Sequence, residues 1–107
     1  MSSYQVDREK WQKMSIFDQM GNIYSEVGRT FNAKQIHDEI KAQEAAIRAF
    51  DLFDATVEVL IAEKSPKLTE VLRAREVFAG EFLSSDTSTL DSYLMPFAMS
   101  ARLKQIN

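Results

Sequence analysis

Glycine and proline are scarce in this chain: three glycines and two prolines occur in 107 residues. A fold rich in β-strands needs many tight turns, and these two residue types are the ones that most often form them. Residues with high helix propensity, such as Ala, Leu, Met, Glu, Gln, Lys and Arg, are instead spread along the whole chain. We therefore predict an all-α fold, and the length favours a single helical-bundle domain that spans residues 1–107.

The composition and charge are typical of a globular protein. Hydrophobic residues make up 45% of the chain, which is enough to build a core. The net charge is -3 with both signs interleaved, so we do not expect nucleic acid to be a partner, because phosphate binding relies on clustered Lys and Arg. The absence of cysteine excludes disulfides and thiol catalysis. A polar N-terminus and the lack of a long apolar stretch predict a cytoplasmic protein with no membrane span.

The spacing of apolar residues predicts four helices. The first runs from about residue 3 to Asn32, where a capping box with Gln35 opens the second, which ends near residue 64. Ser65-Pro66 starts the third, since Ser caps a helix and Pro suits its first position. The fourth begins at Ser88 and is kinked or broken at Pro96. Short connections then favour an antiparallel up-down-up-down four-helix bundle.

The predicted helices have unequal lengths. The first two would each extend about 40 Å and the last two only about 27 Å, which leaves part of the first hairpin uncovered. Apolar residues would then face water, either at its tip or on a second side of the second helix, unless another subunit covers them. These residues are Val27, Phe31, Ile36 and Ile40 at the tip, and Leu52 and Val59 on the second side. We therefore expect a homo-oligomer, and another protein partner is a further possibility.

One arginine occupies an abnormal position in the predicted third helix. Arg75 falls in the middle of its apolar face, and Asp54 falls inside the apolar face of the second helix, with Asp51 and Glu58 beside it. A buried guanidinium needs a carboxylate partner, so we predict that Arg75 pairs with Asp54 or Asp51 in the core. Such a pair either fixes the register of the two helices or provides a site for a small anion.

The remaining polar residues predict neither a catalytic nor a metal site. Asn22, Glu26 and Arg29 form a polar ridge, which we interpret as a solvated outer face of the first helix, with a polar recognition stripe as the alternative. His37 is the only histidine, and we expect it in a solvated turn. Carboxylate-histidine motifs, a Gly-rich phosphate loop and a nucleophile elbow are all missing from the sequence, so we expect no enzyme and no cofactor.

Gly21 and Gly28 lie seven residues apart on the apolar face of the first helix. Glycine inside a helix costs about 1 kcal/mol relative to alanine. Both positions therefore indicate that another element, most simply a neighbouring helix, approaches closely there. A bound ligand is the alternative.

Three segments, residues 19–29, 50–54 and 72–77, resemble a group of small uncharacterised bacterial helical-bundle proteins. In architecture the chain is more remotely similar to the four-helix bundle family that contains proteins encoded in 23S rRNA intervening sequences and the accessory protein of diversity-generating retroelements. That resemblance implies oligomeric bundles, with nucleic-acid association in some members. Our leading hypothesis is a non-enzymatic, self-associating scaffold or adaptor. The alternatives are a nucleic-acid accessory protein and a small-anion-binding bundle that uses Arg75 and Asp54.

Overall fold

The computed structural model describes residues 5–84, and all of its regular structure is helical. The four helices in this range are α1 (Arg8–Gln12), α2 (Ile16–Gln35), α3 (Glu39–Ala62) and α4 (Leu68–Ser84). The all-α prediction is therefore confirmed. The helix predicted from Ser88, with its kink at Pro96, lies outside the described residues.

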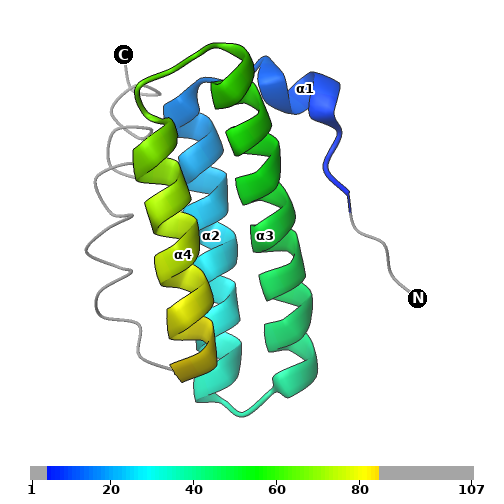
Figure 1. The fold of residues 1–107 in the computed structure, drawn as a ribbon. Coiled ribbons are helices and arrows are strands. Elements are labelled where there is room, and N and C mark those ends of the chain that lie inside the picture. Colours follow the sequence, from blue (N-terminus) through cyan, green and yellow to red (C-terminus); the bar gives the residue numbers. More distant parts are fainter. Residues whose placement is uncertain (1–4, 85–107) are drawn as a thin grey trace.

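The three long helices pack side by side, and Figure 1 shows the chain reversing direction at each of their two short connections. The short helix α1 lies against only one end of α3, the end at which α3 finishes. Within residues 5–84, no helix combines the length and the hydrophobicity that crossing a membrane requires.

The predicted first helix is in fact two helices. The chain leaves the helical path at residues 13–15, and Ser15 then caps α2 by accepting a hydrogen bond on its Oγ from the N–H of Asp18, at 3.1 Å. Asp7 caps α1 in the same way, by accepting from the N–H groups of Glu9 and Lys10. A side-chain cap supplies the hydrogen bonds that a helix cannot make at its own start. The break allows α1 to fold back over α3 instead of extending α2.

The connection between α2 and α3 differs from the predicted capping box at Asn32 and Gln35, because both residues still belong to α2. The helix ends in a Schellman motif: Asp38 N–H donates to Ala33 O at 2.8 Å, and His37 N–H donates to Lys34 O at 3.1 Å. His37 has a φ of 61°, the left-handed conformation that this motif requires. Asp38 is then the cap of α3.

The second connection repeats the same motif. Ser65 N–H donates to Leu60 O at 3.0 Å, and Lys64 N–H donates to Ile61 O at 3.1 Å, with Lys64 at a φ of 52°. The predicted cap at Ser65 is present, since its Oγ accepts from the N–H of Lys67 at 3.2 Å. Regular helix follows from Leu68, two residues later than the predicted first helical position at Pro66.

The core lies between α2, α3 and α4, and Phe78 is at its centre. Its ring packs against Phe31, Phe50, Phe53 and Phe82. The face that α3 contributes is rich in alanine, and small side chains let neighbouring helices approach closely. The buried hydrophobic residues of α3 are Ala42, Ala45, Ala46, Ala49, Leu52, Phe53, Ala55 and Leu60.

Four isoleucines of the described residues are exposed, one at the end of α2 and three on α3. They are Ile36, Ile40, Ile47 and Ile61. Helix α3 has two apolar stripes. The one made of alanine and phenylalanine packs into the core, so the one that contains Ile40, Ile47 and Ile61 faces outward.

Two further expectations are wrong: that another element approaches Gly28 closely, and that all the apolar residues of the first hairpin named above need a second subunit to cover them. A Cβ atom on Gly28 would meet no atom within 4 Å, so nothing approaches this glycine closely. Leu52 is buried within this same chain, and Val27 and Phe31 are buried as well. Of the residues predicted to need a second subunit, Ile36 and Ile40 are therefore the ones that face water.

Candidate functional site

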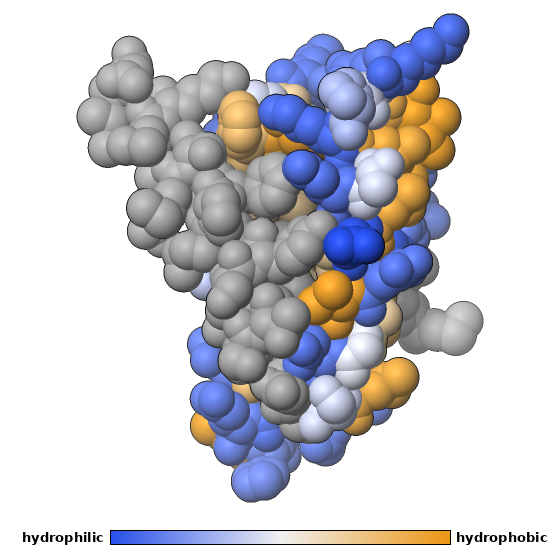
Figure 2. Space-filling model, turned by 60° about the vertical axis from the view of Figure 1, so that its left-hand side comes forward, coloured by the Kyte–Doolittle hydropathy of each residue, from blue (hydrophilic) through white to orange (hydrophobic). Residues whose placement is uncertain are grey.

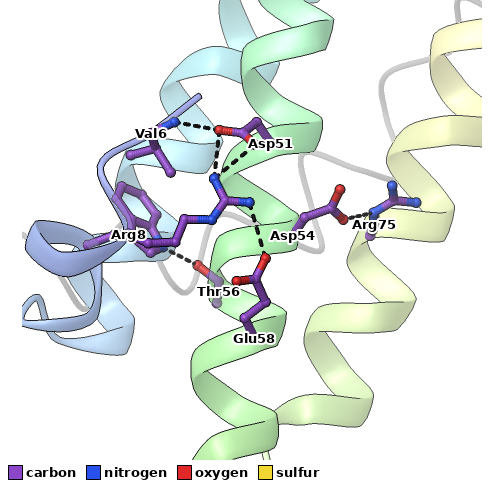
Figure 3. A network of polar contacts seen from close by, with 8 residues as sticks. Val6, Arg8, Asp51, Asp54, Thr56, Glu58 and Arg75 are labelled. Carbon is purple, nitrogen blue, oxygen red and sulfur yellow. Dashed lines mark hydrogen bonds and ion pairs between the residues drawn. The ribbon is translucent and has the colours of Figure 1, made fainter. Parts of the chain in front are cut away.

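A cluster of charged groups ties α1 to the outer side of α3 (Figure 3). Asp51 accepts hydrogen bonds from the backbone N–H of Val6 at 2.6 Å and from Arg8 Nη1 at 2.9 Å. Arg8 Nη2 donates to Glu58 Oε2 at 3.1 Å. Burial alone lowers the pKa of Arg8, but its hydrogen bonds to Glu58 and Asp51 outweigh that effect and raise the pKa above the ordinary value. Arg8 is thus a permanent positive charge that fastens α1.

Trp11 anchors α1 to α2 and α3. Its indole Nε1 donates to Thr56 Oγ1 at 2.9 Å, and Gln19 Nε2 donates to the backbone carbonyl of Trp11 at 2.9 Å. All three residues are buried. Trp11 is thus bonded to both long helices, through its backbone carbonyl to Gln19 of α2 and through its indole to Thr56 of α3.

The predicted partner of Arg75 is Asp54, and not Asp51. Arg75 Nε donates to Asp54 Oδ1 at 2.8 Å, and the guanidinium lies 5.0 Å from the centre of the Phe50 ring. Figure 3 shows Asp51 and Asp54 pointing to opposite sides of α3, so Asp51 meets Arg8 instead. The expectation of a buried pair was wrong: the side chains of Arg75 and Asp54 are 36% and 50% exposed. The pair lies at the edge of the α3–α4 interface, where water reaches it.

The polar ridge of Asn22, Glu26 and Arg29 is not a uniformly solvated face. Asn22 is exposed and donates to Asp18 O, whereas the side chain of Glu26 is only 10% exposed. Glu26 Oε1 accepts from Arg29 Nη1 at 3.0 Å, and Glu26 Oε2 accepts from Arg48 Nε of α3 at 2.7 Å. A buried carboxylate is thus shared by two arginines, which leaves this triad with a net charge of +1.

An open groove extends from this triad toward the turn between α2 and α3. It has a volume of about 480 Å³, within the range of small-molecule sites. Its lining residues are Arg29, Asn32, Ala33 and Ile36 on the α2 side and Lys41, Glu44, Ala45 and Arg48 on α3. Gln19 and Ala33 lie two helical turns from Glu26, in opposite directions on the same stripe of α2. Trp11, which is bonded to Gln19, therefore lies along the same stripe of α2 as the groove, toward the opposite end of the helix.

Sequence reasoning missed this triad because it treated Glu26 as part of an outer face. The available signal was that Gln19, Glu26 and Ala33 are spaced by seven and border the apolar residues Ile23 and Val27. A carboxylate on the border of an apolar stripe needs a cation from a neighbouring helix, and Arg48 is such a cation.

Several acidic side chains of residues 5–84 face a guanidinium group, and His37 is exposed in its turn. This range contains no group of three or more His, Cys, Asp or Glu side chains arranged to hold a metal ion. The chemistry that the arrangement offers is charge pairing, with spare guanidinium donors at the open groove.

Comparison with protein-family models, with curated proteins and with solved structures found no match for this chain.

Proposed function

We propose that the protein is a non-enzymatic helical scaffold or adaptor that associates with copies of itself through the outer face of α3. The observation that carries this proposal is a row of exposed isoleucines. Ile40, Ile47 and Ile61, which we call the isoleucine stripe, are 73%, 48% and 59% exposed. Figure 2 shows hydrophobic side chains at the surface of one face of the molecule, among hydrophilic ones.

The spacing of the stripe is that of a helix–helix contact. Ile40, Ile47, Asp54 and Ile61 are each seven residues apart, so they follow one side of α3 as the residues of a coiled-coil seam do. Exposed β-branched residues in such a row lose contact with water when a second helix packs on them, and that loss stabilises association.

Asp54 interrupts the stripe with a charge, and Arg75 of α4 partners it. A single polar position within an apolar seam is a known way to fix register and the number of chains, at some cost in stability. The Arg75–Asp54 pair, half-exposed in one chain, is placed to act in this way when two stripes meet. This role accounts for a charged residue in the middle of an otherwise apolar row.

Light scattering behind size exclusion, at low and high salt, tests the proposal. We expect a mass of at least twice the 12.2 kDa of one chain, at both salt concentrations, since salt does not weaken apolar contacts. The double variant Ile40→Gln/Ile47→Gln removes two exposed side chains and should be monomeric. Leu83→Gln changes an exposed apolar position on α4, and as the control it should keep the wild-type mass.

A monomeric wild type would contradict self-association. So would an oligomer whose mass is the same in the Ile40→Gln/Ile47→Gln variant. Circular dichroism of the variants separates loss of association from loss of fold.

A further inference from the structure

The open groove between α2 and α3 combines three features of a ligand site that are independent of self-association. It has room for a small molecule, it is lined by apolar side chains at Ala33, Ile36 and Ala45, and it carries cationic groups at one end. Farther along the same two helices, Trp11 is buried and bonded to Gln19 of α2 and Thr56 of α3, so an aromatic side chain already packs on this pair of helices.

The cationic end is held rigid by a buried counter-charge. Glu26 binds Nε of Arg48 and Nη1 of Arg29. Within residues 5–84, Arg48 Nη1 and Nη2 and Arg29 Nη2 have no hydrogen-bond acceptor, and both arginines line the groove. Arg48 is the better oriented of the two, because its side chain is 31% exposed and its bond to Glu26 is 2.7 Å, and a guanidinium that is already oriented loses little entropy when it binds an anion.

The charges of the groove select for a singly charged anion. The triad has a net charge of +1, and Lys41 at the rim already lies 3.9 Å from Asp38. Glu44 also lines the groove, and its carboxylate opposes a second negative charge. A carboxylate can match the fork of a guanidinium group with two parallel hydrogen bonds, and the side of each guanidinium that Glu26 does not use is available for such a pair.

We infer that this groove binds a small organic carboxylate with an apolar body, its head group on the free nitrogens of Arg29 and Arg48 and its body along Ala33, Ile36 and Ala45. The site differs from the anion site that the sequence suggested at Arg75 and Asp54, whose guanidinium lies at the α3–α4 edge. The expected ligand resembles the Trp11 side chain in having an apolar body, and it differs in carrying a carboxylate that binds Arg29 and Arg48.

The test is a titration followed by NMR of the ¹⁵N-labelled chain, with 4-phenylbutanoate as the probe and its amide as the uncharged isostere. We expect saturable binding of the acid in the millimolar range, as for other small ligands. The shifts should centre on the amides of residues 29–33 and 44–48. The amide should bind about tenfold more weakly or not at all, because it lacks the charge-assisted hydrogen bonds.

Two variants and a control sharpen the result. Arg29→Gln keeps the Arg48–Glu26 pair and should weaken the acid about tenfold, whereas Glu44→Gln should strengthen it. Arg73→Gln, an exposed position on α4 away from the groove, should bind as the wild type does. The inference is overturned if the acid shows no saturable binding, if the shifts map elsewhere, if the amide binds as tightly as the acid, or if Arg29→Gln leaves the affinity unchanged.

Discussion

The two arginines that share Glu26 should contribute very differently to stability. The side chain of Arg48 is 31% exposed and that of Arg29 is 64% exposed, while Glu26 itself is 10% exposed. Arg48 makes a 2.7 Å bond between two helices, and Arg29 makes a 3.0 Å bond within one helix, three residues from Glu26. The comparison of Arg48→Gln with Arg29→Gln isolates this difference, because each variant loses one charge and replaces arginine by the same residue.

The expected magnitudes follow from burial. A hydrogen bond to a charged group is worth about 1.5–3 kcal/mol, and removing it leaves part of the Glu26 charge uncompensated, so Arg48→Gln should cost about 2 kcal/mol. An exposed pair within one helix is worth about 0.3–0.5 kcal/mol, so Arg29→Gln should cost no more than that. The difference, about 1.5 kcal/mol, corresponds to roughly a tenfold change in the folding equilibrium constant.

Urea unfolding followed by circular dichroism measures both free energies, with the slope m checked to be unchanged. A double-mutant cycle between Glu26→Gln and Arg48→Gln should give a coupling energy of about 1 kcal/mol or more, since the two side chains touch. If Arg29→Gln costs as much as Arg48→Gln, or if the cycle shows no coupling, then Glu26 is not a buried carboxylate held mainly by Arg48.

Three further changes test other parts of the account by the same urea measurement. Trp11→Ala should cost about 3–5 kcal/mol, because it empties a buried indole site and leaves Thr56 without its donor; a loss under 1 kcal/mol would mean that α1 is not docked. His37→Gly should stabilise the chain by about 0.5–1 kcal/mol. The left-handed conformation costs about 1–2 kcal/mol for a residue with a Cβ, and glycine avoids this cost but loses about half of the gain because its unfolded state has more entropy. A destabilised variant would refute the Schellman motif at the end of α2. Asp54→Asn should cost less than about 1 kcal/mol, because its pair with Arg75 is exposed to water. A loss of about 3 kcal/mol would instead mean that the pair is buried, as the sequence suggested.

The sequence predicted the helical class, and it predicted that Arg75 pairs with Asp54 or Asp51, of which Asp54 is the partner although the pair is not buried; both predictions rest on local reasons. Scarce glycine and proline limit turns along the whole chain, and Arg75 and Asp54 were recognised because each stands among apolar neighbours on its own helix. Which apolar face turns inward is a different question. Helix α3 carries both an isoleucine and an alanine–phenylalanine stripe, and the choice between them depends on how closely α2 and α4 approach.

The break before α2 and the role of Glu26 were missed for different reasons. The break had a local signal, Ser15 followed by Asp18 three residues later, but the continuous apolar pattern across it outweighed that signal. The place of Glu26 beside the apolar stripe of its helix was a local signal, but its second cation could not be read locally, because Arg48 is 22 residues away on another helix. Pairings between helices follow from packing, which a helical wheel of one segment does not contain.

Self-association through the isoleucine stripe is the central claim, and site-specific cross-linking tests it most directly. The chain contains no cysteine, so a single Gln43→Cys substitution, one turn from Ile40 on the exposed side of α3, places a unique thiol beside the stripe. With a short bismaleimide we predict a covalent dimer for Gln43→Cys and none for Ser25→Cys, which lies on the exposed face of α2. Failure of Gln43→Cys to cross-link, or equal cross-linking of both variants, would contradict the claim.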